Sequence, residues 1–365
     1  QLHGGRAVVR AVLGALGKMP GYRAAEAGEF ARRAFDNGKI DLAEAEGLAD
    51  LIDAETEAQR RQAVAQAGGM LSGLYDGWRS SILEAQALVE AAIDFADEPD
   101  VESDTVARAR SIVATLAVAI RRHLDDGHRG EILRQGFKVA LTGAPNVGKS
   151  SLLNALARRE AAIVSPEAGT TRDVIVVSLD IEGLPIVLSD TAGLRETDSA
   201  VEQEGIARTV RAVEEAQLVL WVTDVSNPEA DLAAELMPFA EKILPVMNKA
   251  DTLAGGIPRE VPDDGIAISA RTGAGLADLT RRIGAIARER LGDGGEEPVI
   301  TQARHRMHLE AAARSLADYL DGPPFAIELR AEDLRLAATE IGRITGRIDV
   351  EDILDHVFKR FCIGK

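Results

Sequence analysis

Residues 143–150 read Gly-Ala-Pro-Asn-Val-Gly-Lys-Ser, between an apolar run, Phe137–Thr142, and a helical pattern, 151–156. They match G-x-x-x-x-G-K-[ST], and strand, glycine loop and helix form the context that a phosphate-binding loop requires. The glycines let backbone N–H groups turn towards phosphate oxygens, and the helix N-terminus adds the positive end of its dipole. We expect Lys149 to reach the β- and γ-phosphates and Ser150 to bind Mg²⁺. The residues expected to bind nucleotide here are Asn146, Val147, Gly148, Lys149, Ser150 and Ser151.

Two later segments predict the contacts to Mg²⁺ and the γ-phosphate. In Gly169-Thr-Thr-Arg-Asp173, ahead of a strand pattern at 174–180, a threonine hydroxyl can bind Mg²⁺ when a γ-phosphate is present. Asp190-Thr-Ala-Gly193 follows the apolar run 186–188, so that Asp190 can hold Mg²⁺ through water and the Gly193 N–H can meet the γ-phosphate. These segments place Gly169, Thr170, Thr171, Asp190, Thr191, Ala192 and Gly193 at the nucleotide.

The segment Asn248-Lys-Ala-Asp251 predicts that the base is guanine. It ends the apolar run 243–247, and a carboxylate at Asp251 can accept from the ring N–H and the exocyclic amine of guanine. Adenine lacks both donors in that arrangement, so it would leave a charged acceptor unpaired. After the short strand pattern 266–268, backbone N–H groups of Ser269 and Ala270 can reach the guanine carbonyl. We expect Asn248, Lys249, Asp251, Ser269, Ala270 and Arg271 to contact the nucleotide.

The residue that orients the attacking water cannot be the usual glutamine. Directly after Gly193, where Ras-like enzymes carry that glutamine, the chain has Leu194, and an aliphatic side chain cannot hold water. Glu202 is the nearest polar candidate, and its alternative interpretation is a solvated glutamate on a helix face. The carbonyl oxygen of Asn146 could help to bind a monovalent cation beside the phosphates.

The order of strand and helix patterns predicts an α/β domain inserted into an α-helical bundle. Strand patterns at 137–142, 174–180, 186–188, 218–223, 243–247 and 266–268 belong to the α/β domain. Helical periodicity occurs at 42–52, 82–95, 106–124, 309–316, 334–341 and 350–361. Glycine-containing turns near 125–130 and 292–298 mark the junctions. The expected domains are 1–40, which resembles the end of an α/β domain, then 41–133, 134–291 and 292–365.

Composition narrows the classes of partner. The formal net charge of −17 argues against general nucleic-acid binding, which needs a local excess of Lys and Arg. No apolar run approaches the roughly 20 residues of a membrane span, and one cysteine, Cys362, fits a reducing cytosol. We therefore expect a cytoplasmic protein. Because the chain starts at Gln1, inside what looks like continuing structure, we also expect a preceding part.

Over essentially its whole length the chain resembles the MnmE (TrmE) family of tRNA-modification GTPases. The related Era and Der GTPases share the nucleotide motifs but not the flanking segments. The matching segments are GEFARRAFDNGKIDL (28–42), AEGLADLIDA (45–54), GAPNVGKSS (143–151), GTTRD (169–173), DTAGLR (190–195) and FCIGK (361–365).

The resemblance implies a potassium-dependent GTPase that acts as a homodimer. It implies that Glu202 orients the water, with Lys149 and Thr171 as further catalytic residues. It assigns Mg²⁺ to Ser150 and Thr171, and K⁺ to Asn146, Ser165, Glu167 and Thr170.

The resemblance also implies partners and a second cofactor. The family works with the FAD protein MnmG (GidA), in a heterotetramer, on the wobble uridine of certain tRNAs. Together they add a carboxymethylaminomethyl or aminomethyl group, using a 5-formyl- or methylene-tetrahydrofolate. Lys39 and Lys365 match positions of the folate site, and residues 1–40 correspond to the C-terminal remnant of an α+β folate-binding domain.

Several features keep a second interpretation. Cys362 is either a structural thiol or one that serves the modification chemistry. His305 and His308 could suggest a metal, but a solvated helix face is the favoured interpretation. The arginine pairs at 32–33, 121–122 and 281–282 are typical of helix surfaces, although any of them could touch tRNA. For the whole chain, the alternative to a tRNA-modification enzyme is an Era- or Der-like switch in ribosome assembly.

Overall fold

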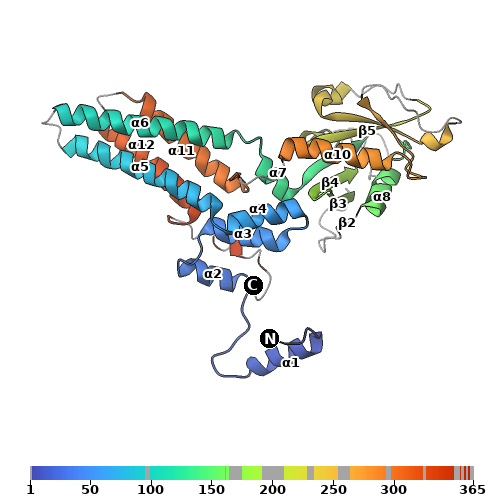
Figure 1. Ribbon diagram of the computed structural model, residues 1–365, viewed down its shortest axis with the longest axis horizontal. Coiled ribbons are helices and arrows are strands. Elements are labelled where there is room, and N and C mark those ends of the chain that lie inside the picture. Colours follow the sequence, from blue (N-terminus) through green and yellow to red (C-terminus); the bar gives the residue numbers. More distant parts are fainter. Residues whose placement is uncertain are drawn as a thin grey trace, which may run out of the picture. The chain divides into compact units, whose positions relative to one another are not determined.

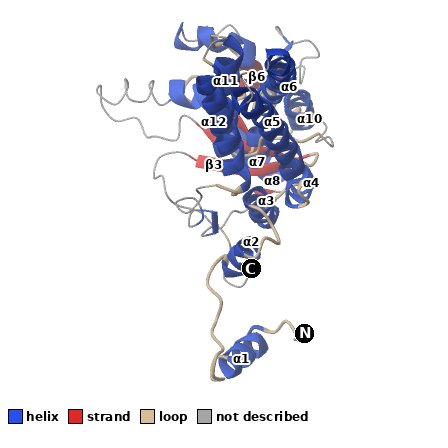
Figure 2. Ribbon diagram, turned by 90° about the vertical axis from the view of Figure 1, so that its left-hand side faces the viewer, coloured by secondary structure: helices blue, strands red, loops and turns tan. Residues whose placement is uncertain are grey.

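The structure is a computed structural model, and its described residues form two compact units. The helical unit comprises Gln1–Asp53, Ala63–Asp126 and Gln302–Lys365, and the sheet unit comprises Ala54–Gln62 and Gly127–Thr301. Figures 1 and 2 show the helices and strands of both units. The described residues are 2–94, 99–160, 162–163, 175–190, 209–227, 234–253, 264–292, 297–323, 326–348, 354, 357–358 and 361.

The sheet unit is built on seven strands in the order β2-β3-β4-β1-β5-β6-β7. The pairs β1–β4, β1–β5, β5–β6 and β6–β7 are parallel, whereas β2–β3 and β3–β4 are antiparallel. The strands are β1 (Phe137–Thr142), β2 (Ala162–Ile163), β3 (Ile175–Ile181), β4 (Leu184–Asp190), β5 (Leu218–Asp224), β6 (Ile243–Asn248) and β7 (Ile266–Ala267).

Both faces of the sheet are covered, which explains why its strands read as continuous apolar runs. Val139 and Leu141 of β1 pack on one face with the apolar side chains of α7 (Arg129–Gln135), α8 (Lys149–Arg159) and α10 (Leu276–Leu291). Ala140, which points the other way, packs with Val213 and with Leu236 of the 3-10 helix η1 (Ala234–Lys242). A second 3-10 helix, η2 (Ala250–Thr252), follows β6.

The register of the parallel strands brings their carboxyl ends to one edge. Leu141 pairs with Asp190, Thr142 with Trp221, and Asp224 with Asn248. The segments that follow β1, β4, β5 and β6 therefore start at the same edge, where an open α/β sheet places its ligands.

The helical unit is held by four long helices that lie side by side (Figures 1 and 2). These are α5 (Met70–Asp94), α6 (Pro99–Leu124), α11 (Ala303–Asp321) and α12 (Ile327–Thr345). Helix α5 packs on α6 and α12, and α11 packs on the same two helices. Their inner faces carry aliphatic and alanine side chains at helical spacing, including Ile82, Val113, Leu316 and Ile341. In the described part of the chain, no helix combines the length and apolar character that crossing a membrane needs.

Shorter helices precede the four long ones. They are α1 (Arg6–Leu16), α2 (Glu29–Asp36), α3 (Leu42–Asp53) and α4 (Glu57–Ala67), and α4 begins in the sheet unit and ends in the helical unit. Helix α4 packs closely on α3, since a Cβ on Gly47 would lie 2.5 Å from the backbone nitrogen of Ala67. Phe358 and Phe361, just before Cys362 in the sequence, are buried with Ala31 and Leu42.

Most predicted elements are confirmed, and the exceptions have physical causes. All six strand patterns form strands, and the described helices cover the patterns at 42–52, 82–94, 106–124, 309–316 and 334–341. The pattern at 350–361 lies largely outside the described residues. Helix α4 was missed because its sequence, EAQRRQAVAQA, buries only Ala63 and Gln66. Residues 2–41, expected to look like an α/β domain, contain α1 and α2 and only a single bridge residue, Ala27.

Candidate functional site

The loop after β1 adopts a shape that only its glycines allow. Gly143 has φ +139°, and a Cβ there would lie 2.1 Å from the carbonyl oxygen of Val222 in β5. Gly148 has φ +96°, and its Cβ would lie 2.4 Å from the amide nitrogen of Asn248. Both positions combine a left-handed backbone with close approach of another chain segment, so any side chain would displace the loop. The loop is thereby fixed against β5 and β6 before helix α8 starts at Lys149.

Lys149 and Ser150 are placed as a phosphate and metal site requires. The buried Lys149 Nζ donates to the carbonyl oxygens of Gly143 and Ala144, each at 2.8 Å, so its ammonium lies across the loop. Ser150 Oγ donates to Asp190 Oδ2 at 2.6 Å. A hydroxyl and a carboxylate this close are hard oxygen donors, which suits Mg²⁺. Ser150, in the first turn of α8, therefore contacts the last residue of β4.

Asn248 ties the phosphate loop to the segment that follows β7. Its side chain is buried, with Nδ2 donating to the carbonyl oxygen of Val147 at 2.8 Å and Oδ1 accepting from the N–H of Ala270 at 3.0 Å. The N–H of Ser269 donates to Ala274 O at 2.9 Å. A guanine carbonyl that bound to Ser269 and Ala270, as expected from the sequence, would share or replace these acceptors.

Asp251 is oriented from two sides. Ser269 Oγ donates to its Oδ1 at 2.6 Å, and Arg271 Nη2 lies 2.5 Å from its Oδ2. The hydrogen bond from Ser269, helped by the charge of Arg271, lowers the pKa of the Asp251 carboxyl below its ordinary value. The side chain of Arg271 is 78% exposed, so it can leave the carboxylate when a ligand supplies other donors.

The remaining predicted residues are not all brought to this edge. Ser151 is exposed on the first turn of α8, and Asn146 is exposed in the loop with φ 62°. Lys39 belongs to the helical unit, where it is exposed in the turn between α2 and α3. Eleven residues lie outside the described residues: Ser165, Glu167, Gly169, Thr170, Thr171, Thr191, Ala192, Gly193, Glu202, Cys362 and Lys365.

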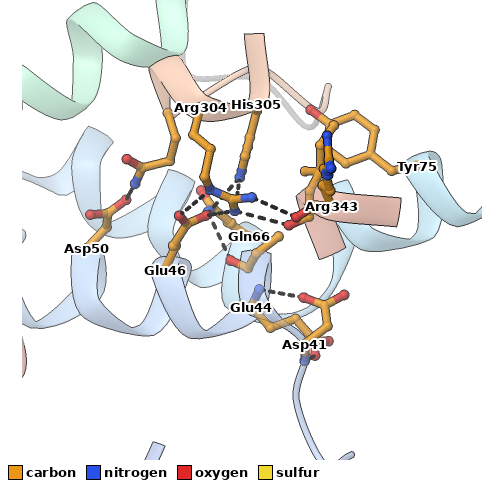
Figure 3. Close-up of polar contacts among 12 residues, drawn as sticks. Asp41, Glu44, Glu46, Asp50, Gln66, Tyr75, Arg304, His305 and Arg343 are labelled. Atoms are coloured by element: carbon orange, nitrogen blue, oxygen red, sulfur yellow. Dashed lines mark hydrogen bonds and ion pairs between the residues drawn. The ribbon is translucent and has the colours of Figure 1, made fainter. Parts of the chain in front are cut away.

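The helical unit contains a buried polar cluster that the sequence did not reveal (Figure 3). The carboxylate of Glu46 on α3 accepts from Arg304 Nε at 3.1 Å and Nη2 at 2.9 Å, and lies 2.8 Å from His305 Nε2. Arg304 also donates to the carbonyl oxygens of Arg343 and Ile344, both at 3.0 Å, at the end of α12. One arginine thus joins α3, α11 and α12.

The interpretation of His305 and His308 as a solvated helix face is wrong. His305 is 0% exposed and His308 is 6% exposed, and His308 Nδ1 lies 2.7 Å from Glu340 Oε2. Both histidines face the packed side of α11, where carboxylates from α3 and α12 meet them. Within the described ranges, no three His, Cys, Asp or Glu residues are arranged to hold a metal ion.

Burial and neighbouring charge shift the pKa of the Glu46 carboxyl in opposite directions. Burial raises the pKa of the Glu46 carboxyl, but the charge of Arg304 and the hydrogen bonds from His305 and Arg304 outweigh it and hold the pKa below its ordinary value. Burial lowers the pKa of the His305 imidazole below its ordinary value of 6.5. No described group hydrogen-bonds to His305 Nδ1, so a second proton there would be a buried donor without an acceptor. We infer a neutral His305 that donates from Nε2 to an ionised Glu46.

Taken together, the strained glycine loop, the Lys149 ammonium across it, the Ser150–Asp190 contact and the preset Asp251 define a P-loop GTPase.

Comparison with known proteins identifies the family. The profile of the MnmE helical domain matches residues 42–362, and the profile of the GTP-binding protein TrmE N-terminus matches residues 1–39. The tRNA modification GTPase MnmE of Parvibaculum lavamentivorans is 53% identical over 370 residues, covering 100% of this chain and 82% of the relative. The protein of the same name from Rhodospirillum rubrum is 51% identical, covering 100% and 79%. The chain belongs to the MnmE family.

Among solved structures, a variant of Aquifex aeolicus Era bound to GDP and AlF4⁻ is 25% identical. That match covers 49% of this chain and 66% of Era, with a TM-score of 0.33, which is too low to support an argument about this chain.

Proposed function

We propose that this GTPase is potassium-activated and acts with MnmG (GidA) on the wobble uridine of certain tRNAs, adding a carboxymethylaminomethyl or aminomethyl group. The observation that carries the proposal is the match over the whole chain, at 53% identity, to a protein named as a tRNA modification GTPase. In this proposal residues 134–291 form the GTPase domain, and 41–133 with 292–365 form the helical domain that carries it.

The chemistry of the carboxyl-end edge supports GTP and Mg²⁺ as its ligands. Lys149 would neutralise the β- and γ-phosphates, and Ser150 with Thr171 would bind Mg²⁺, while Asp190 accepts from Ser150 and can hold metal-bound water. Magnesium supplies charge stabilisation to the phosphates, and the protein supplies its orientation. Asp251, already fixed by Ser269, would read the guanine amine and ring N–H.

The proposed potassium site and the residue that orients the attacking water combine the phosphate loop with segments that follow it in the sequence. We propose that Asn146, which is exposed in the loop, binds K⁺ together with Ser165, Glu167 and Thr170. A cation there would supply the positive charge that other GTPases take from an arginine. Glu202 would orient the water, because Leu194 cannot. Closure of two such domains in a homodimer would assemble this site.

The helical unit would serve the tRNA chemistry. Phe361 is buried with Ala31 of α2 and Leu42 of α3, the two helices that flank Lys39 in the sequence, and Cys362 follows Phe361 in the sequence. We propose that Lys39 and Lys365 contact a tetrahydrofolate derivative and that Cys362 acts in the modification. The first 40 residues would be the remnant of the domain that holds this folate.

Potassium dependence tests the catalytic part. We expect GTP hydrolysis by the full chain to be much faster in KCl than in NaCl at equal ionic strength, and Asn146→Ala to remove the difference while GDP affinity holds. Asn154→Ala, which changes an exposed asparagine on α8 that has no predicted role in the site, is the matched comparison. Equal rates in the two salts would contradict the cation site.

The tRNA from cells that lack the protein tests the biological part. The expected result is loss of the wobble-uridine modification and its return when the gene is restored. Normal modification would instead support an Era- or Der-like assembly switch.

A further inference from the structure

Lys249 lies between Asn248 and Asp251 in the sequence. Its side chain has a charged partner, Asp224, that is not part of the segment 248–251. Its Nζ lies 2.8 Å from Oδ2 of Asp224, the last residue of β5. Asp224 is directly opposite Asn248 in the β5–β6 register, and the N–H of Val225 donates to the Asn248 carbonyl at 2.9 Å. The two strand ends are thus locked together beside the lysine.

The carboxylate of Asp224 is held independently of the lysine. Its Oδ1 accepts from the N–H of Ser226 at 3.0 Å and from Ser226 Oγ at 2.8 Å, while Oδ2 is left to face Lys249. The hydrogen bond from Lys249, followed by those from Ser226, lowers the pKa of the carboxyl to about 2. A solvated surface ion pair has two mobile partners, whereas here one partner is fixed by two donors of Ser226 before the lysine is counted.

The position of Lys249 explains why its side chain needs a fixed partner to stay in one rotamer. Its backbone is left-handed, with φ 65°, and it caps the short helix η2 that carries Asp251. The neighbouring Asn248 is anchored to the phosphate loop and Asp251 to Ser269, so every polar side chain of the segment has its own acceptor or donor. A long lysine side chain that is 39% exposed would otherwise sample many rotamers.

We propose that Asp224 is a positioning residue for the nucleotide: it holds the Lys249 ammonium so that the lysine stem forms a preset wall beside the purine ring. The proposal rests on the guanine site proposed above. Because the wall contacts the ring and reads none of its substituents, Asp224 strengthens the binding of every purine nucleotide that Asp251 admits. Base choice stays with Asp251.

A double-mutant cycle on the full chain tests whether Asp224 acts through Lys249. The affinities of fluorescent GDP and IDP are measured for Asp224→Asn, Lys249→Met and the double variant. We expect Asp224→Asn to weaken both nucleotides by the same factor, about five- to tenfold, which is less than a buried charge-assisted hydrogen bond would give because the pair is partly exposed. In the Lys249→Met background, Asp224→Asn should leave the affinities for GDP and IDP almost unchanged. The KM for GTP should rise, with kcat at saturating GTP unchanged.

The matched control is Asp278→Asn, which breaks an exposed ion pair with Arg281 on α10 of the same unit. It should leave GDP affinity unchanged, and the thermal unfolding midpoints of all variants are compared to exclude loss of folding. The proposal would be overturned if Asp224→Asn weakened nucleotide binding equally in the presence and absence of Lys249. It would also be overturned if Asp224→Asn alone left the affinity unchanged.

A separate variant distinguishes failure of the proposal from failure of the guanine site. Asp251→Asn replaces an acceptor by a donor and should shift the preference from GDP to XDP, whose ring carries a carbonyl where guanine has its amine. If that shift is absent, the guanine site is wrong. If the shift occurs but the cycle shows no coupling, only the role of Asp224 is wrong.

Discussion

Replacing Glu46 by glutamine tests whether the buried cluster holds the helical unit together. The change keeps the shape of the side chain and removes its charge, so Arg304 loses its only described carboxylate partner. The two side chains are 5% and 14% exposed, and breaking a buried pair on one side costs about 3–5 kcal/mol. Arg304 keeps its two carbonyl acceptors at the end of α12. We therefore expect the free energy of unfolding to fall by about 3 kcal/mol, the lower end of that range.

The assay is urea unfolding followed by tryptophan fluorescence. The chain has two tryptophans, Trp78 on α5 and Trp221 on β5, so a Trp221→Phe background restricts the signal to the helical unit. The Trp78 ring lies 5.3 Å from the His123 ring, and its emission should change when these helices separate.

The comparison variant is Glu332→Gln, which breaks an exposed pair with Arg335 on α12. Its unfolding curve should match that of the parent protein. If Glu46→Gln lowered the free energy of unfolding by less than about 1 kcal/mol, the cluster would behave as a surface ion pair. The reasoning from burial would then be refuted.

Four further variants and a change of pH test other parts of the structure. Gly47→Ala should destabilise the helical unit by about 1–3 kcal/mol in the same urea assay, because the new Cβ meets the Ala67 backbone, whereas Gly73→Ala, with open space around it, should stabilise α5 by about 0.5–1 kcal/mol. Lowering the pH from 7 to 5 should reduce the unfolding free energy, since the pKa of His305 is lower in the folded state and the unfolded state binds the extra proton; the urea midpoint of His305→Gln should fall less. Asn248→Ala removes two hydrogen bonds between the phosphate loop and the segment after β7, and fluorescence titration should show GDP affinity reduced by about 10- to 100-fold.

The part of the candidate nucleotide site that the structure describes could be predicted because its signals are local. Each motif is contiguous and stands at the end of an apolar run, and parallel strands bring such ends to one edge. The contact of Ser150 with Asp190 follows from that rule, and the structure has it. Asp224 was missed, although its position after the run 218–223 is a signal of the same kind.

The polar cluster of the helical unit could not be predicted because its signal is not local. Glu46 and Arg304 are 258 residues apart, and nothing in either neighbourhood identifies the other. Two histidines at a spacing of three predict a polar helix face, and only tertiary packing shows that carboxylates of other helices contact this face inside the unit. Helix α4 was missed for a related reason, since alanine and glutamine give almost no apolar periodicity.

The separation of Glu46 from Arg304 has a consequence for synthesis on the ribosome. At about 5–20 residues per second, the 258 residues between them take roughly 13–50 seconds to translate. During that interval the whole of the sheet unit is translated and can fold, while Glu46 remains a solvated carboxylate without its arginine partner. The helical unit can close only when α11 and α12 arrive, so these two late helices decide when Glu46 becomes buried.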